Sequence, residues 1–305
     1  MTAPDIGLFV RTFNIPGGAP APRWAEIEAQ VRFAEAEGFN SVSFADHHLW
    51  RLESGTMGFW EAYTMVSAAA AVTSRIEVGV SVTNAPFRNP ALLAKMADTL
   101  DEISNGRFVL GLGAGGGYPS DYETMGIPTD HRFSRFTDTI AIVHGLLRTG
   151  AVDHTGSYAS APKAELSPRG PSEHGPRLVI GAKGPKMLDL AARYGDEWNW
   201  YHYAGEPSPD TFAPLQEALD EACRAIDRDP ASIRRSIDSG VAQEGTQDTA
   251  KQYGLGGALA GSVEQIADAI GRFGEAGIDE VRLGLAPDDD EHLAMVAEVV
   301  VHLHG

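Results

Sequence analysis

The chain of 305 residues is longer than a minimal fold and matches the usual size of one α/β barrel, although two domains of ordinary size would also fit. Apolar residues make up 43% of it, enough to bury a large core, which excludes a disordered chain. A net charge of −18 makes nucleic acid and anionic membranes poor partners.

The beginning of the chain lacks the basic segment and apolar run of a secretory leader. No stretch reaches about 18 uncharged apolar residues, the length typical of a membrane-spanning helix. The single cysteine, Cys223, has no partner for an internal disulfide and is expected to be a buried, inert thiol. We therefore expect a soluble, cytoplasmic protein that does not contact a membrane.

Apolar, β-rich runs alternate with helical patterns from one end of the chain to the other. Predicted strands lie at residues 6–10, 41–45, 76–82, 107–113, 178–182, 197–201, 233–241 and 280–285. Predicted helices lie at residues 24–38, 59–72, 90–103, 134–147, 185–194, 210–226, from 262 onward, and 293–303. The helix that follows Ser262 opens with a capping box, because Gln265 stands three residues after the serine.

Eight strand–helix units in about 300 residues predict a closed parallel (β/α)₈ barrel that forms a single domain over residues 1–305. The alternative is an open, doubly wound sheet. No strand is followed by a G-x-G-x-x-G motif that opens a helix, which counts against that alternative. Two longer loops, at residues 151–176 and 242–261, are predicted as insertions after the fourth helix and the seventh strand.

Active sites of such barrels lie at the carboxyl ends of the strands, so the residues after each strand are candidates. Asp46 and His47 follow the second strand and would make an acid–base pair, because histidine titrates near neutrality. The alternative is that they only cap the strand. A metal site is disfavoured, because His47 and His48 are adjacent and point apart on extended backbone.

Two further segments suit an anionic or planar ligand. Glycines at 113 and 115–117 after the fourth strand permit close backbone approach by a ring or a phosphate, or else form a flexible loop. Lys183 and Lys186 flank the start of a helix, where free N–H groups favour phosphate. A solvated basic turn is the alternative, and the glycine-rich stretch before Ser262 is a rival phosphate site.

Taken together and in order, these segments resemble the bacterial luciferase-like family of flavin and deazaflavin oxidoreductases. The resemblance covers nearly the whole chain and is carried by residues 45–48, 78–84, 104–115, 181–188 and 261–267. It implies the luciferase-like variant of the barrel, with a flavin-type ring against the third strand and a non-prolyl cis peptide at Ser81-Val82. It also implies that His47 stands beside the reactive ring, as the catalytic residue.

The cofactor site implied by the resemblance includes the loop at 115–118 and the turn at 183–186, near which the phosphate would lie. Its predicted members are Asp46, Ser81, Val82, Thr83, Asn84, Ala114, Gly115, Gly116, Gly117, Tyr118, Gly181, Ala182, Lys183, Gly184, Pro185 and Lys186. No residue is assigned to a metal.

The family divides by cofactor into monooxygenases that use FMN with oxygen and enzymes that use the deazaflavin coenzyme F420 for hydride transfer. Residues 81–82 with 86–90, and residues 184–188, resemble the deazaflavin branch, and its polyanionic tail suits Lys183 and Lys186. Gly116 stands where deazaflavin-dependent sugar-phosphate dehydrogenases carry a glutamate, so that substrate class is not expected.

The sequence therefore predicts an F420-dependent oxidoreductase acting on a small organic molecule, and the resemblance suggests a homodimer. The predicted substrate pocket is lined by Phe9, Phe13, Trp50, Trp200 and Tyr203. Alternatives are an FMN-dependent monooxygenase, a flavin-binding barrel without turnover, and a barrel hydrolase, for which only Asp46 is well placed.

Overall fold

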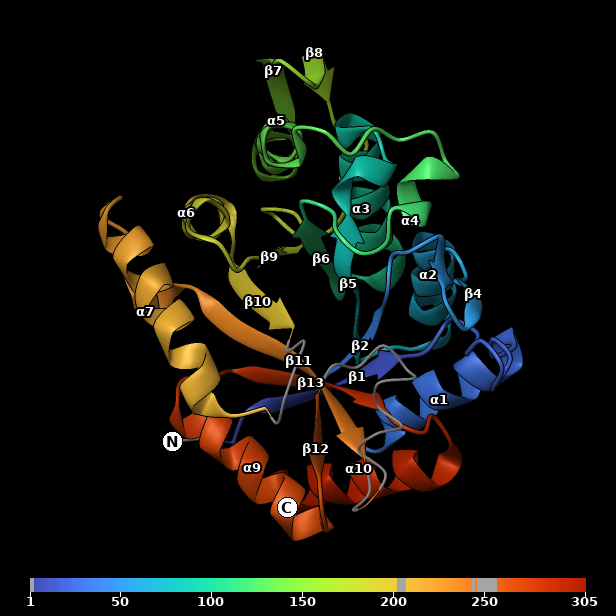
Figure 1. Ribbon diagram of the computed structural model, residues 1–305. Coiled ribbons are helices and arrows are strands. Elements are labelled where there is room, and N and C mark those ends of the chain that lie inside the picture. The colour runs from blue at the N-terminus through green and yellow to red at the C-terminus, as the bar shows by residue number, and fades with distance from the viewer. Residues whose placement is uncertain (1–2, 202–206, 243–244, 246–256) are drawn as a thin grey trace.

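All eight predicted strands are present in the computed structural model, which describes residues 3–201, 207–242, 245 and 257–305. Within those residues the eight strands are parallel and each pairs with two neighbours, so that they close into a ring (Figure 1). In ring order they are β1 (Asp5–Val10), β2 (Ser41–Phe44), β5 (Glu77–Asn84), β6 (Phe108–Gly113), β9 (Arg177–Gly181), β10 (Glu197–Tyr201), β11 (Arg234–Ala242) and β13 (Glu280–Leu285). The predicted barrel is confirmed, and the open doubly wound sheet is wrong.

Helices cover the outside of the ring (Figure 1). They are α1 (Trp24–Ala36), α2 (Ala62–Val72), α3 (Pro90–Ser104), α5 (Arg132–Thr149), α6 (Pro185–Tyr194), α7 (Pro209–Arg224), α9 (Val263–Glu275) and α10 (Asp290–His304). The capping box before α9 forms as predicted, with Ser262 and Gln265 exchanging hydrogen bonds. None of the described helices has the length and apolar character needed to cross a membrane.

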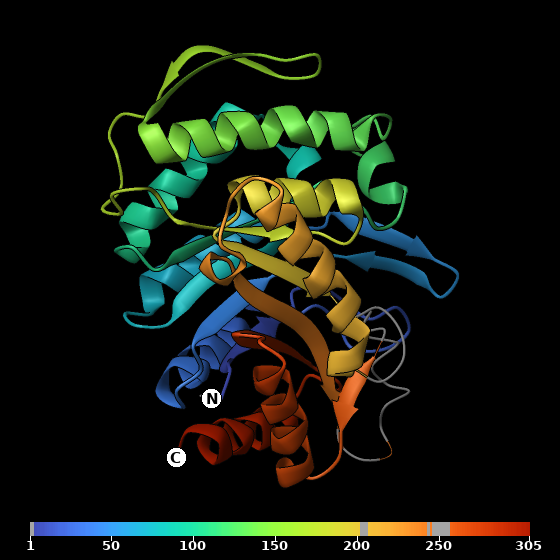
Figure 2. The ribbon, with the colours of Figure 1, turned by 90° about the vertical axis from the view of Figure 1, so that its left-hand side faces the viewer.

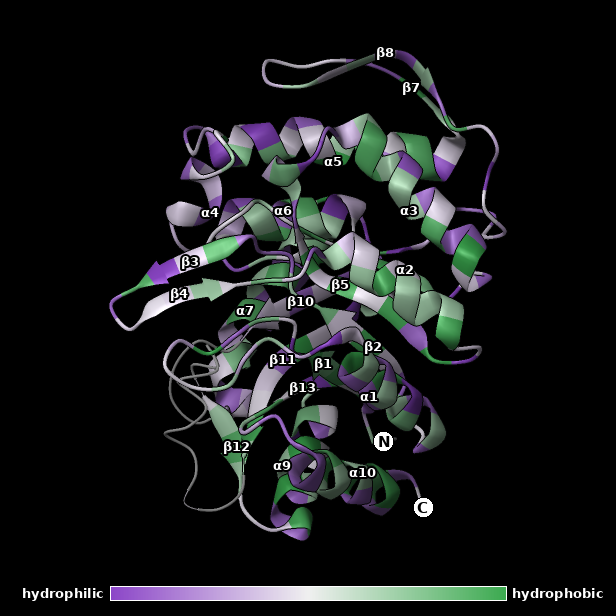
Figure 3. Ribbon diagram, turned by 90° about the vertical axis from the view of Figure 1, so that its right-hand side faces the viewer, coloured by the Kyte–Doolittle hydropathy of each residue, from purple (hydrophilic) through white to green (hydrophobic). Residues whose placement is uncertain are grey.

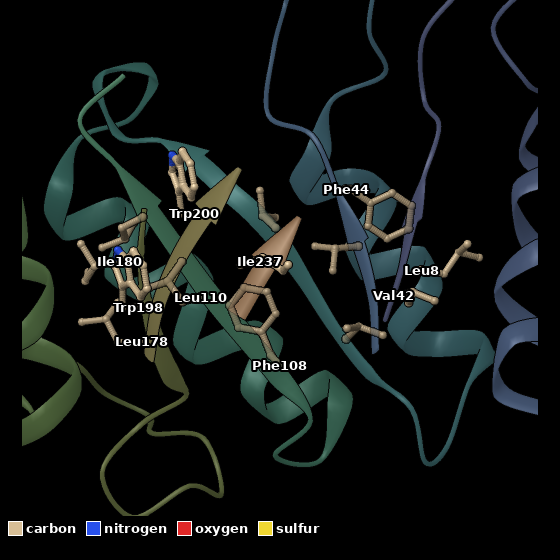
Figure 4. Packing of buried hydrophobic residues seen from close by; sticks show 14 of the residues in the cluster. Leu8, Val42, Phe44, Phe108, Leu110, Leu178, Ile180, Trp198, Trp200 and Ile237 are labelled. Carbon is tan, nitrogen blue, oxygen red and sulfur yellow. The ribbon is translucent and has the colours of Figure 1, made fainter. Parts of the chain in front are cut away.

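The main core lies between the strands and these helices. Leu110, Leu178, Ile180 and Trp198, from the neighbouring strands β6, β9 and β10, pack together on the outer face of the barrel (Figure 4). The buried indole of Trp198 donates to the carbonyl of Ala182 at 2.8 Å, which satisfies its polar atom. Cys223 is buried as predicted, and burial raises the pKa of its thiol.

Several short elements were not predicted. The predicted loop at 151–176 contains a hairpin of β7 (Ala151–Thr155) and β8 (Ser160–Glu165), which lies on the outer side of α5 (Figure 2). A second hairpin, β3 (Leu49–Leu52) and β4 (Gly55–Gly58), projects from the body of the protein (Figure 3). The other short elements are η1 (Ala85–Phe87), α4 (Ser120–Glu123), η2 (Pro230–Ser232) and β12 (Ala258–Ala260).

The predicted loop at 242–261 lies mostly outside the described residues. Its described end forms β12, which pairs in parallel with the end of β11.

The two hairpins, β3–β4 and β7–β8, are short and largely exposed, so they lack the apolar run by which a buried strand is recognised in a sequence.

A cluster of charged side chains fills the amino-terminal end of the barrel interior, which we call the floor of the barrel. Arg282 on β13 is buried inside the ring, and its Nη2 donates to both Glu197 and Glu280 at 2.7 Å. The guanidiniums of Arg177 and Arg234 approach Glu197 from the amino-terminal end, at 3.1 and 3.4 Å. Although burial raises the pKa of Glu197, the charges of Arg282 and Arg177 hold it below its ordinary value.

We predict that Arg282→Met lowers the free energy of unfolding by about 3–5 kcal/mol, because it leaves buried carboxylates without their enclosed cation. Denaturant unfolding at neutral pH measures this loss. Arg224→Met is the matched control, because Arg224 pairs with Asp220 on the exposed face of α7 and should contribute less than about 1 kcal/mol. Equal losses in the two variants would contradict a buried charge cluster that holds the strands together.

Candidate functional site

The third strand of the barrel, β5, carries an irregularity at the carboxyl-terminal mouth. Its pairing with β6 shifts between Val80 and Thr83, and the Ser81-Val82 peptide bond is cis, as predicted. Two glycines on the adjacent strand β6 and one on β9, the next strand of the ring, make room for the Val82 side chain. A Cβ atom would lie 3.0 Å from that side chain at Gly111, 2.8 Å at Gly113 and 3.1 Å at Gly181. The glycines of β6 and β9 therefore admit this bulge into the mouth.

Asp46 does not face the site as a free carboxylate. Its two oxygens accept from both Nη atoms of Arg88, at 2.6 and 2.9 Å, and from the backbone N–H of Asn84 at 2.9 Å. Thr83 is likewise engaged, with its hydroxyl 2.9 Å from that of Tyr63. These predicted site residues hold the end of β5 against the end of β2. They therefore stabilise the wall of the barrel mouth and leave no free carboxylate at Asp46.

His47 is paired with Asp121, a residue that the sequence did not single out. The Nδ1 atom of His47 lies 2.7 Å from Oδ2 of Asp121, and the indole N–H of Trp50 donates to the same oxygen at 2.9 Å. The other oxygen accepts from the backbone N–H groups of His48 and Leu49, both at 2.9 Å. The predicted acid–base pair of His47 with Asp46 is therefore wrong, and Asp121 is the partner.

This geometry fixes which nitrogen of the imidazole faces the carboxylate. Burial raises the pKa of Asp121, but hydrogen bonds from His47, His48 and Trp50 outweigh it and hold that pKa below its ordinary value. An ionised carboxylate only accepts hydrogen bonds, so Nδ1 of His47 carries a proton. The remaining ring atom, Nε2, is the one left to act on a ligand, and the His47 side chain is 25% exposed.

Aromatic rings surround His47. Its ring lies 4.6 Å from that of Trp50 and 5.2 Å from that of Phe59, and Phe59 contacts Phe13 at 4.9 Å. Tyr118, 43% exposed, lies 5.0 Å from Trp50 at the outer edge. The structure thus brings Trp50, a predicted pocket residue, next to His47, and a second one, Phe13, joins the same cluster through Phe59.

Two other predicted pocket residues, Phe9 and Trp200, lie on strands of the barrel. Trp200, which Figure 4 labels, is buried and packs on Phe212 of α7 at 4.4 Å between ring centroids. Phe9 lies on β1 and is partly buried. Tyr203 lies outside the described residues.

The glycine loop after β6 is fixed by a second residue that was not predicted, Tyr122 on α4. Its hydroxyl accepts from the backbone N–H of Gly116 at 2.6 Å and lies 3.1 Å from Oδ1 of Asn84. Gly115 and Gly117 have φ values of 86° and 88°, which favour glycine. A Cβ at Gly116 would meet nothing within 4 Å, so this backbone faces open space beside Ala114.

The loop after β9 lies beside the glycine loop, because β6 and β9 pair. Its Gly184 precedes α6 without a side-chain cap, and Pro185 is the first residue of that helix. Lys183 and Lys186 are exposed and form no ion pair within the described part of the chain; their ammonium groups lie 5.6 Å from the Trp200 ring and 5.5 Å from the Phe133 ring. Ala182 instead turns inward, with its carbonyl bound to Trp198.

No other part of the described chain provides a better candidate site. No group of three or more His, Cys, Asp or Glu side chains is arranged to hold a metal ion within the described residues. A hollow of about 380 Å³ opens on the amino-terminal face, lined by charged groups that include Arg75, Arg177 and Arg234. That face of such barrels serves stability rather than chemistry, so the site is assigned to the opposite mouth.

Comparisons with known proteins agree with this geometry. Residues 5–254 match the model of the family described as luciferase-like monooxygenase. A 5,10-methylenetetrahydromethanopterin reductase from Archaeoglobus fulgidus is 34% identical over 177 residues, which cover 58% of this chain and 49% of that protein. A pyrimidine monooxygenase, RutA, from Pseudomonas syringae pv. syringae is 32% identical over 244 residues, which cover 75% of this chain and 66% of that protein. This chain therefore spans about half to two thirds of the length of the curated relatives it matches.

Solved structures share the fold. An F420-dependent secondary alcohol dehydrogenase, in complex with an F420-acetone adduct, superposes over the whole of both chains with a TM-score of 0.82 and 21% identity. The long-chain alkane monooxygenase LadA has a TM-score of 0.81 and 14% identity, and the match covers 99% of this chain and 91% of that one. At these identities the likeness shows the barrel alone.

We predict that Asp121→Asn lowers the free energy of unfolding by about 1.5–3 kcal/mol at pH 7, because an amide cannot accept from every donor that meets the carboxylate. Because the pKa of Asp121 in the folded protein is held below 3.8, its ionised carboxylate stabilises the fold above that pH. This stabilisation is lost as the pH falls through the pKa of Asp121 in the folded protein. The difference between wild type and variant should therefore shrink below about pH 4, as denaturant unfolding at several pH values can measure.

Asp130→Asn is the control, because Asp130 is 59% exposed and pairs only at the surface. Equal effects of the two substitutions at pH 7 would show that Asp121 does not hold the His47 loop.

Proposed function

The chain belongs to the luciferase-like monooxygenase family, and we propose that it binds the deazaflavin coenzyme F420 in the barrel mouth and uses it for hydride transfer to or from a small organic substrate. The observation that carries this proposal is the pairing of a glycine-lined mouth, where Val82 enters beside Gly113 and Gly181, with Lys183 and Lys186 at the start of α6, which form no ion pair with any described residue. A flat ring with an anionic tail has the shape and charge for such a site.

The residues present fit that group. A Cβ atom added at Gly116 or Gly184 would meet nothing within 4 Å, so the chain leaves room for a ligand beside these two glycines. Lys183 and Lys186 supply positive charge in a chain of net charge −18, and the free N–H groups at the start of α6 favour phosphate. The bound ring would supply the hydride chemistry, while the protein orients it and excludes water.

His47 has the geometry of the acid–base group. Asp121 fixes its ring through Nδ1, and Nε2 remains to exchange a proton with a substrate hydroxyl or carbonyl. No second carboxylate is free beside it among the described residues, because Asp46 is held by Arg88 and Gly116 has no side chain. The same proposal includes the homodimer that the resemblance suggests.

An FMN-dependent monooxygenase is the second candidate. It is supported by the relative RutA, a pyrimidine monooxygenase whose match covers 75% of this chain. The two candidates share the ring site and His47, and they differ in the anionic tail that the lysines would meet.

A binding titration separates the candidates. We predict that F420 binds wild type more tightly than FMN does, by absorbance and fluorescence titration, because its longer anionic tail reaches both lysines. The variant Lys183→Ala/Lys186→Ala should weaken F420 binding roughly tenfold or more, the equivalent of about 1.4 kcal/mol. Lys163→Ala is the control, because Lys163 is an exposed lysine of the β7–β8 hairpin. Tight FMN binding with no F420 binding would overturn the choice of cofactor.

The role of His47 has its own test. We predict that His47→Ala lowers kcat by about 10²–10⁴-fold at saturating substrate, measured with the alcohol, aldehyde or enone that gives the highest turnover. His48→Ala is the control, because the His48 side chain is exposed and only its backbone contacts Asp121. Full turnover by His47→Ala would rule out the acid–base role.

A further inference from the structure

A buried carboxylate that the proposed chemistry does not use lies directly below the barrel mouth. Asp238 on β11 is 5% exposed and accepts from the hydroxyl of Ser81 at 2.7 Å and from the side-chain amide of Asn199 at 3.0 Å. Ser81 belongs to the β5 bulge and is itself only partly buried. The pair therefore connects the charged floor of the barrel to the surface on which a ring would rest.

The distribution of charge leaves Asp238 poorly compensated. Three carboxylates share the enclosed cation of Arg282, whose Nη2 is 2.7 Å from Glu197 and from Glu280, whereas Nη1 is 3.7 Å from Asp238. From the other elements Asp238 meets neutral groups, Ser81 on β5 and Asn199 on β10. The remaining cations of the floor, Arg177 and Arg234, reach the two glutamates and not Asp238.

We propose that Asp238 is a positioning residue that holds a proton below the mouth, and that its protonation decides whether the Ser81 hydroxyl presents a donor or an acceptor to the bound ring. When Asp238 is ionised, the Ser81 hydroxyl donates its hydrogen bond to Asp238. Ser81 can then only accept a hydrogen bond from a ligand in the mouth. When Asp238 is protonated, it donates to Ser81, and the Ser81 proton is released toward the mouth. The inference rests on the proposed function, because it requires a ring against β5.

The environment supports this assignment. Burial raises the pKa of Asp238, and the opposing effects of Arg282, Ser81 and Asn199 do not cancel the rise. A reduced ring is electron-rich and accepts hydrogen bonds, so it binds best to the form in which Ser81 donates. Binding of the reduced ring should then draw a proton onto Asp238.

Two substitutions separate this role from a merely structural one. In Asp238→Asn the side-chain oxygen can still accept from Asn199, and the new NH₂ group donates permanently to Ser81, as the protonated acid would. Ser81→Ala removes the hydroxyl altogether. Ser43→Ala is the matched control: Ser43 is a buried serine on the neighbouring strand β2 that lines the same small interior cavity as Ser81, and its hydroxyl has no hydrogen-bond partner among the described residues.

The experiment is a titration of each protein with chemically reduced F420 across pH 5–9. We expect the Kd of wild type and Ser43→Ala to rise with pH by up to about tenfold per unit, the limit for one linked proton. Relative to wild type, the Kd of Asp238→Asn should stay low and lose that pH dependence, and the Kd of Ser81→Ala should be raised at low pH. Equal pH dependence in wild type and Asp238→Asn would overturn the proposal, as would loss of that dependence in Ser43→Ala.

A second measurement on the protein without cofactor distinguishes failure of this inference from failure of the proposed function. A raised folded pKa stabilises the fold at low pH, and that benefit is lost as the pH rises. The stability of wild type relative to Asp238→Asn should therefore fall as the pH rises above about 4. If it does not, Asp238 holds no proton and the inference is wrong; if it does but wild type binds neither F420 nor FMN, the proposed function fails instead.

Discussion

The enclosed guanidinium of Arg282 is the constraint on which the interior of this barrel depends. Eight strands that close into a ring must fill their interior, and here the lower half holds one cation between Glu197 and Glu280. Such a cluster is costly to desolvate and is tolerated only when each charge is paired. It fixes β10 against β13 and leaves Asp238 as the least compensated acid, just below the mouth.

At the mouth of the barrel, glycines stand where larger side chains would collide with the β5 bulge. Gly111, Gly113 and Gly181 admit Val82 from the β5 bulge, and the loops beyond them expose backbone at Gly116 and Gly184. Around this space the polar groups are already fixed, because Asp46 holds Arg88 and Asp121 holds His47. A site built in this way is pre-organised, so the energy of ligand binding is not spent on ordering His47, the proposed acid–base residue.

Local sequence was sufficient for the repeating parts of the fold. Strands such as residues 197–201 and 280–285 are predicted to the residue, because buried parallel strands are continuous apolar or β-rich runs between turn residues. The hairpin at Ala151–Thr155 and Ser160–Glu165 was missed, because exposed strands lack that signal. The partner of His47 was missed for a different reason: Asp121 lies 74 residues away, and no local pattern reports a contact at that separation. Asp46 is adjacent in sequence, yet it turns toward Arg88, since successive side chains on extended backbone point apart.

The most direct test of a ring cofactor in the barrel mouth is a crystal structure of the protein grown with oxidised F420. The arrangement described above predicts the ring against Ser81 and Val82, its anionic tail at Lys183 and Lys186, and Nε2 of His47 facing the ring while Nδ1 stays on Asp121. A ring bound outside the mouth, or a His47 ring turned away from it, would contradict that arrangement.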